Sequence, residues 1–243
     1  MDVKKIVKEH YSNVAKTGCS CSCNNKMADA KIIAKSIGYS NKELSEAGIA
    51  NLGLGCGNPV ALSDIKIGEI VVDLGSGAGI DCFLASKKVG IKGKIIGLDF
   101  NEDMLKLARK NAKKLKLKNV EFKKADIEKM PLQDNSVNVI ISNCVINLAP
   151  NKNKVFSEAY RVLKKGGRMF ISDIVLLKEL SVKEKADKGL ISGCVAGALL
   201  KDEYIKIIKS AGFKVEILSE DKKISKEQYE GMPLESLKIK AIK

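Results

Sequence analysis

The chain has 243 residues, of which 45% are hydrophobic and 30% charged, and its formal net charge is +14 at pH 7. This length is enough to bury a full hydrophobic core, and no stretch approaches the roughly 18 consecutive apolar residues of a membrane span. The first 18 residues are charged and helix-patterned, without the apolar segment of a signal peptide. We therefore expect no membrane partner and a cytoplasmic protein, whose seven cysteines are kept largely reduced.

The basic surplus does not predict a nucleic-acid partner. Only Arg109, Arg161 and Arg168 among the 43 basic residues are arginines, and aromatic residues make up 5% of the chain. Base recognition and stacking favour arginine and aromatic side chains, whereas the lysines are spread over helical segments such as 106–116. We interpret the charge as a solvated surface and expect no nucleic-acid partner.

Two kinds of segment follow one another along the chain. Residues 1–62 are helical and carry cysteines and glycines, and we interpret them as an N-terminal cap on a domain at 63–243. From residue 68, short β-branched runs alternate with helical patterns, which is typical of a doubly wound α/β sheet. The pattern predicts strands at 69–74, 94–100, 120–126, 137–148, 168–177, 214–223 and 236–243. Helices are predicted at 80–90, 101–117, 154–167 and 202–213, the third ending at Gly166-Gly167.

Residues 178–200 interrupt this alternation, and we interpret them as an insertion. They follow the carboxyl end of the fifth predicted strand, and in doubly wound sheets the carboxyl ends of the strands border the ligand crevice. The cap and the insertion are therefore both expected to help build a substrate site.

A glycine-rich turn follows the first predicted strand in the segment VVDLGSGAG at 71–79. Such a turn lets a ligand approach the backbone and presents the amides of the following helix. Acidic residues stand at the ends of the first three strands, as Asp73, Asp99 and Asp126. In this arrangement the chain resembles the class I S-adenosylmethionine methyltransferases more than the dehydrogenases, whose glycines follow the pattern G-x-G-x-x-G. The resemblance implies a Rossmann-like, seven-stranded α/β fold.

The same resemblance implies a role for each residue of this site. Asp73 would organise the amino-acid end of S-adenosylmethionine, Asp99 would accept the ribose hydroxyl protons, and Asp126 would accept from the adenine amino group. Met104 would cover the adenine, and Ile127 would donate its backbone N–H to it. The full set of cofactor residues that we expect is Asp73, Gly75, Ser76, Gly77, Gly79, Asp99, Phe100, Met104, Asp126, Ile127 and Asn143.

The chain lacks an evident catalytic base, which methyl transfer to oxygen or nitrogen usually needs. The single histidine, His10, stands in the cap and is interpreted as a surface residue. Three cysteines instead flank the predicted crevice: Cys56 in the cap, Cys144 near the end of the fourth strand and Cys194 in the insertion. Thiols bind soft acceptors such as trivalent arsenic, and an acceptor with its own lone pair needs no base. Cys82, within a predicted helix, is interpreted as a packing residue.

Over nearly its whole length the chain resembles the arsenite methyltransferases. The segments that carry the resemblance are GLGCGNPVALSDIKIGEIVVDLGSGAGIDCF, ISNCVINLAPNKNKVFSEAYRVLKKGGRMFISDI and ISGCVAGAL. The resemblance implies that Cys144 and Cys194 bind As(III) as thiolates, with Cys56 or an external thiol as the third ligand. The arsenic lone pair would then attack the methyl group of S-adenosylmethionine. The same soft ligands would accept antimonite.

The resemblance also implies a redox role for Cys56. Its disulfide partner is expected among Cys19, Cys21 and Cys23, and the disulfide would be reduced by thioredoxin, glutathione or a similar external thiol. The same Cys-x-Cys-x-Cys run is an alternative ligand set for zinc or an iron–sulfur cluster, although zinc sites usually space their cysteines by two to four residues.

Three other functions stay open at this point. The first is a methyltransferase of the same fold that acts on a small organic acceptor, with thiols that are merely structural. The second is a thiol-based metalloid-binding protein with a decayed cofactor fold, against which the intact Asp73, Asp99 and Asp126 speak. The third, methylation of RNA, is motivated by the charge alone.

Overall fold

The computed structural model describes residues 2–18, 26–224, 229 and 231–243. Within them, seven strands form one sheet in the order β3-β2-β1-β4-β5-β7-β6. The strands span Ile70–Leu74 (β1), Lys94–Asp99 (β2), Val120–Lys124 (β3), Val137–Asn143 (β4), Leu163–Leu176 (β5), Lys214–Asp221 (β6) and Leu234–Ile242 (β7). Strand β7 is antiparallel to both of its neighbours, and the pairs from β3 through β5 are parallel. The predicted seven-stranded α/β fold is confirmed.

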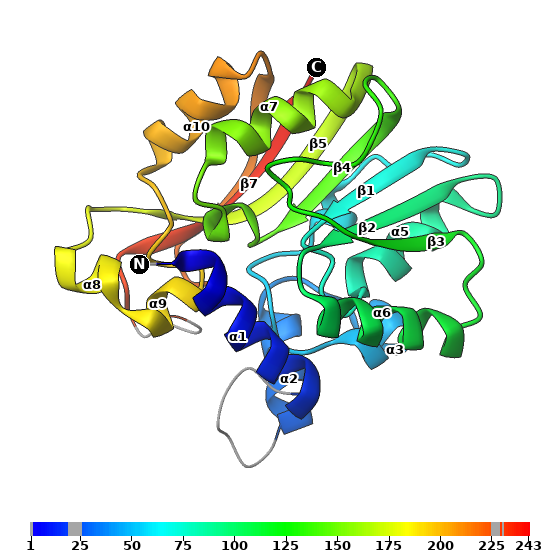
Figure 1. Cartoon of the computed structure of the whole chain (residues 1–243), viewed down its shortest axis with the longest axis horizontal. Helices are drawn as coiled ribbons and strands as arrows, with labels where there is room; N and C mark the ends of the chain where they lie inside the picture. The colour runs from blue at the N-terminus through cyan, green and yellow to red at the C-terminus, as the bar shows by residue number, and fades with distance from the viewer. Residues whose placement is uncertain (1, 19–25, 225–228, 230) are drawn as a thin grey trace.

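Helices cover both faces of the sheet (Figure 1). Helices α5 (Ile80–Val89) and α6 (Glu102–Lys114) pack on one face, and α7 (Lys152–Val162) and α10 (Lys201–Ser210) pack on the other. Successive strand residues point to opposite faces, so Val71 joins the core beneath α5 and α6 while Val72 joins the core beneath α7 and α10. Among the described helices, none has the length and apolar character needed to cross a bilayer.

The order of the strands changes direction at β1, because β2 lies on one side of it and β4 on the other. The connections that leave β1 and β4 therefore diverge toward opposite edges of the sheet. In doubly wound sheets a ligand crevice opens at such a point, beyond the carboxyl ends of the strands. The candidate site is thus expected beyond Leu74 and Asn143.

The N-terminal cap shares a core with the sheet. Its helices are α1 (Val3–Thr17), α2 (Lys26–Ser36), α3 (Asn41–Ala47) and α4 (Pro59–Leu62), with a 3-10 turn η1 at Gly48–Ala50. Val7, Tyr39 and Val60 belong to the same buried cluster as Val71 of β1. Helix α1, dark blue in Figure 1, contacts both α6 and α9. The cap is therefore held close to the carboxyl ends of the strands.

The insertion after β5 forms two short helices, α8 (Val182–Ala186) and α9 (Lys188–Ser192), and a 3-10 turn η2 (Ile146–Leu148) follows β4. Ser181 and Glu184 form a capping box that begins α8. The Tyr11 hydroxyl of α1 donates to the Ser192 carbonyl oxygen at the end of α9 (3.3 Å). The cap and the insertion thus meet each other.

The third predicted helix ends earlier than the sequence pattern indicated. Helix α7 ends at Val162, and Gly166-Gly167 lie inside β5. The Gly166 N–H donates to the Lys243 carbonyl, and the Lys243 N–H donates to the Gly167 carbonyl (both 3.0 Å). The glycines therefore bring β5 against the end of β7. The prediction was wrong because glycine marks helix ends and close backbone approaches alike.

Candidate functional site

One cavity lies where the fold predicts the crevice, at the carboxyl ends of the central strands. The expected cofactor residues that line it are Asp73, Gly75, Ser76, Gly77, Asp99, Phe100, Asp126, Ile127 and Asn143. Cys144 lines the same cavity, and the cap adds Lys4, Tyr11 and Tyr39, which the sequence did not predict. Expected cofactor residues and one of the three candidate thiols therefore share one space.

The glycine turn after β1 borders the cavity with backbone alone. Gly75 has a φ of +66°, and a Cβ there would lie 2.3 Å from the Val145 Cγ2 atom. Gly77, with a φ of +51°, donates its N–H to the Asp99 Oδ2 atom (2.9 Å). The buried Ser76 hydroxyl has no hydrogen-bond partner within the described part of the chain. The turn thus offers a ligand both close backbone approach and an unused polar group.

Asp99 is held by backbone amides at the end of β2. Its Oδ2 atom accepts from Gly77, and its Oδ1 atom accepts from the Asn101 N–H (2.8 Å). Burial raises the pKa of Asp99 to about 6, although these hydrogen bonds act to lower it. Each carboxylate oxygen accepts more than one hydrogen bond, so ionised Asp99 can also accept from neighbouring hydroxyls of a ribose.

A second buried acidic residue, Asp81 in the first turn of α5, was not predicted. Its Oδ1 atom accepts from the Tyr39 hydroxyl (2.7 Å), and its Oδ2 atom accepts from the Asn143 amide Nδ2 (3.2 Å). Burial raises the pKa of Asp81 to about 6, against the effect of these two hydrogen bonds. Burial, with the charge of Asp81, also raises the pKa of Asp73 well above its usual range. An acidic residue inside the apolar run IDCFLA was the sequence signal for it.

Asp126, the expected acceptor for the adenine amino group, is paired with the cap. The Lys4 Nζ atom lies 2.6 Å from Asp126 Oδ2 and 3.2 Å from Glu128 Oε2. Burial acts to raise the pKa of Asp126, but the hydrogen bond and charge of Lys4 outweigh it, so the pKa is lowered. Lys4 and an adenine would therefore compete for the same carboxylate.

Two of the expected cofactor residues, Gly79 and Met104, do not line the cavity. Gly79 is the N-cap of α5, and a Cβ there would lie 2.6 Å from the Phe83 ring. Met104 lies in α6 with its side chain fully buried. Gly79 thus serves the packing of α5, and at the start of α6 Phe100 and Asn101 are the residues that face the cavity.

Cys56 reaches the ends of β4 and β5 because glycines flank it. A Cβ on Gly55 would lie 2.8 Å from the Asn143 Nδ2 atom, and one on Gly57 would lie 2.6 Å from the Ser172 Cβ atom. The Cys56 N–H donates to the Asn143 Oδ1 atom (3.0 Å). The Gly-Cys-Gly loop therefore lies directly on the two strand ends.

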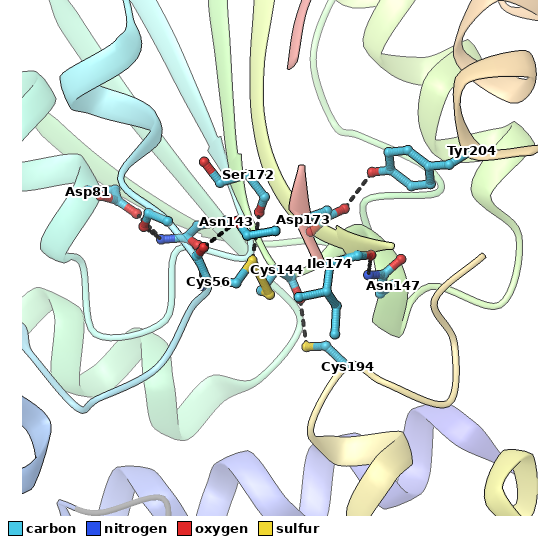
Figure 2. The surroundings of a disulfide bond; sticks show 12 residues. Cys56, Asp81, Asn143, Cys144, Asn147, Ser172, Asp173, Ile174, Cys194 and Tyr204 are labelled. Atoms are coloured by element: carbon cyan, nitrogen blue, oxygen red, sulfur yellow. Dashed lines mark hydrogen bonds between the residues drawn. A yellow bond between two sulfur atoms is a disulfide. The ribbon is translucent and has the colours of Figure 1, made fainter. Parts of the chain in front are cut away.

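Cys56 and Cys144 form a disulfide, with their Cα atoms 5.9 Å apart (Figure 2). The partner of Cys56 was expected among Cys19, Cys21 and Cys23, which lie outside the described residues. The structure pairs it instead with Cys144, because the Cys56 backbone is bound to Asn143, the neighbour of Cys144. The sequence did not reveal this pairing because the two cysteines are 88 residues apart and meet only through tertiary contacts.

Cys194 lies against the same pair. Its thiol donates to the Cys144 carbonyl oxygen (2.7 Å), and its side chain is buried. Burial raises the pKa of Cys194 to about 12, with a further rise from the Asp173 charge and opposing effects of Tyr11 and Lys152. Cys144 and Cys194 have φ angles of +58° and +68°, which cost a residue with a side chain roughly 1 kcal/mol. Such strain is concentrated at functional positions.

A family defined by a methyltransferase domain matches residues 65–212 of the chain. The chain is 42% identical over 234 residues to the arsenite methyltransferase of Halobacterium salinarum. This match covers 90% of this chain and 60% of that protein. It is 35% identical over 223 residues to the arsenite methyltransferase of Rattus norvegicus, with coverages of 87% and 59%. The chain therefore spans about 60% of the length of these curated relatives.

Among solved structures, the fold is similar to CrArsM, an arsenic(III) S-adenosylmethionine methyltransferase from Chlamydomonas reinhardtii. The TM-score is 0.65 at 30% identity, and the match covers 86% of this chain and 72% of that one. The two proteins therefore share both the fold and part of their sequence over most of each chain.

Proposed function

Because this chain belongs to the arsenite S-adenosylmethionine methyltransferases, we propose that it methylates thiol-bound As(III) with S-adenosylmethionine as the methyl donor. The observation that carries the proposal is that the glycine turn, the strand-end carboxylates and Cys144 line the same cavity. Cys56 and Cys194 both contact Cys144. A methyl donor and its acceptor need such a common space, since rate is gained by fixing their relative positions.

The glycine turn after β1 and the strand-end carboxylates form what we call the cofactor end of the site. Its residues fit S-adenosylmethionine. The unpartnered Ser76 hydroxyl and the side-chain-free turn at Gly75 suit the amino-acid group, and Asp99 suits the ribose. When bound, S-adenosylmethionine supplies a methyl group on a positively charged sulfur. The buried carboxyl groups of Asp73, Asp81 and Asp99, where ionised, would stabilise that positive charge electrostatically.

Cys56, Cys144 and Cys194 form what we call the thiol end of the site. It must first be reduced, because Cys56 and Cys144 are joined by a disulfide. An external thiol, such as thioredoxin or glutathione in a reducing cytoplasm, would open the disulfide by exchange. Each protein thiol would then replace one oxygen of arsenite. An S–As bond forms, an As–O bond breaks, and the thiol proton leaves with that oxygen as water.

Sulfur ligation suits this acceptor. Soft thiolates of Cys56, Cys144 and Cys194 would hold As(III), and its lone pair stays free to accept a methyl group without a base. The three cysteines are buried, so water is kept from competing for arsenic. Antimonite offers the same soft chemistry and is proposed as a second substrate. The cap at 1–62 and the insertion at 178–200 would enclose this end of the domain at 63–243.

The test is an incubation of the purified protein with labelled S-adenosylmethionine, arsenite and a dithiol. We expect labelled methylarsenic from the unmodified protein, and a loss of product in Cys144→Ser while S-adenosylmethionine binding is retained. Absence of product from a reduced protein that still binds the cofactor would overturn the proposal. It would direct the search to small organic acceptors.

A further inference from the structure

A carboxyl group that the proposed reaction does not use lies beside the disulfide. Asp173 of β5 is 0% exposed. Its Oδ2 atom accepts a hydrogen bond from the Tyr204 hydroxyl, whereas its Oδ1 atom has no partner within the described residues. Burying a carboxylate oxygen without a partner is unfavourable. This position therefore suits a ligand that accepts electron density from oxygen.

The Asp173 carboxyl group lies close to two sulfur atoms. The Cys56 and Cys144 Sγ atoms and an Asp173 carboxylate oxygen lie within 4.8 Å of one another, and all three residues are buried. They converge because the Cys56 loop lies on Asn143 and Ser172, whose next residues are Cys144 and Asp173. Figure 2 shows Asp173 near the disulfide and the hydrogen bond that joins it to Tyr204.

We propose that reduction of the disulfide creates a binding site for a soft divalent cation of the Zn²⁺ class, with Cys56, Cys144 and Asp173 as ligands. Zinc binds thiolate sulfur at about 2.3 Å and carboxylate oxygen at about 2.0–2.2 Å. A tetrahedral centre with those bonds holds its ligand atoms about 3.5 Å apart, within the 4.8 Å spacing of this cluster. Of the three proposed ligands, Cys144 also lines the cavity.

The site depends on the redox state, because in the oxidised protein the two sulfurs are bonded to each other. A dithiol supplies the two electrons: the protein S–S bond breaks, the dithiol closes into its own disulfide, and its two protons pass to Cys56 and Cys144. Cation binding then releases those protons to water as two S–metal bonds form. The Tyr204 hydroxyl would hold Asp173 in its ligating orientation.

This inference goes beyond the proposed function and does not rest on it, since it needs neither arsenic nor a methyl donor. If both hold, a zinc-class cation and As(III) compete for Cys56 and Cys144.

The experiment uses Cd²⁺ as the probe, because its bonds to sulfur absorb in the ultraviolet. The full chain carries Cys19→Ser, Cys21→Ser and Cys23→Ser, so that the N-terminal thiols do not bind the probe. After reduction and removal of the reductant under nitrogen, we expect uptake of one Cd²⁺ per chain, and none by the oxidised protein. Asp173→Asn should weaken binding at least about tenfold, since even outer partners of metal ligands contribute 10–100-fold. Asp134→Asn, which removes an exposed carboxyl group that is paired with Arg161 away from the cluster, should leave the affinity unchanged.

Equal cadmium affinity with and without Asp173→Asn, or equal uptake by the oxidised and reduced forms, would overturn the proposal. If Asp173→Asn does not fold, cadmium X-ray absorption on its parent decides instead. Sulfur and oxygen neighbours in the first shell support the site, and an all-sulfur shell contradicts it.

Discussion

The two ends of the candidate site are built in different ways. The cofactor end comes from consecutive βα units between residues 70 and 127, and a glycine turn and strand-end carboxylates define it. The thiol end gathers Cys56, Cys144 and Cys194 from the cap, the end of β4 and the insertion. Local backbone geometry therefore fixes the first end, whereas long-range packing and the redox state fix the second. We therefore expect a change of redox state to alter the thiol end more than the cofactor end.

Asn143 is where the two ends meet. Its side chain accepts from the Cys56 N–H (3.0 Å) and donates to the Gly57 carbonyl (2.8 Å) and to Asp81 (3.2 Å). Two residues after Asn143, the Val145 side chain packs against the backbone of Gly75 and leaves no room for a side chain there. A bound cofactor and the thiols are thus linked through β4 and the residues that follow it.

Reduction of the disulfide should have the largest effect, and it should act on the thiol end while cofactor binding is retained. The bond closes a loop between cysteines 88 residues apart, so its loss should lower the free energy of unfolding by about 4.6 kcal/mol in the chain-entropy model. Denaturant titrations with and without a dithiol measure this difference. Cofactor affinity, measured calorimetrically in both states, should stay the same, and a large change in it would break the separation of the two ends.

Cys194→Ser should abolish the thiol end's function alone. We expect arsenite methylation to fall about 100-fold or more, because a direct ligand matters more than the outer partners that contribute 10–100-fold. The matched control is Cys82→Ser, which keeps a donor for the hydrogen bond from Cys82 to Asp73 (3.2 Å) and should retain most activity. Similar losses in the two variants would mean that Cys194 acts only through packing.

Lowering the pH should weaken the binding of S-adenosylmethionine at the cofactor end. Burial raises the pKa of Asp99 to about 6, so below that pH it is increasingly protonated and accepts fewer hydroxyl protons. S-adenosylmethionine affinity should therefore be about tenfold lower at pH 5 than on its plateau above pH 7. Asp99→Asn should bind weakly at every pH. A persisting acid limb in this variant would assign the effect to Asp81, whose pKa is also about 6, or to Asp73, whose pKa is raised as well.

Tyr39→Phe tests the junction between the cap and the cofactor end, with the smallest expected effect. The substitution removes the hydroxyl that donates to Asp81 and accepts from Asn143. It should lower the free energy of unfolding by about 1–2 kcal/mol, since a buried acceptor loses its partner, and should raise the pKa of Asp81 further. Denaturation curves at neutral pH measure the first effect. Unchanged stability would show that the cap is not fastened at this point.

The strand-end residues that line the cavity were predictable from the sequence because local features specify them. The glycine turn at 75–77 and the carboxylate of Asp99 each follow a strand directly, and the parallel sheet brings strand ends together. The same reasoning selected Gly79 and Met104, which spacing alone did not separate from the residues that face the cavity.

Contacts between residues that are far apart in the sequence could not be predicted in this way. The pairing of Cys56 with Cys144 and the position of Asp173 beside the sulfurs depend on how the cap packs on β4 and β5. The ion pair of Lys4 with Asp126 depends on how α1 packs near the end of β3. A resemblance identified the three cysteines as a group, but only the fold revealed which of them are in contact.

The most direct test of the account is arsenic X-ray absorption on the protein incubated with arsenite, before and after reduction of the disulfide. We expect oxygen neighbours around arsenic with the oxidised protein. With the reduced protein we expect sulfur neighbours, which Cys144→Ser should diminish. Oxygen neighbours in both states, or sulfur neighbours that do not depend on Cys144, would contradict the claim that these thiols hold the methyl acceptor.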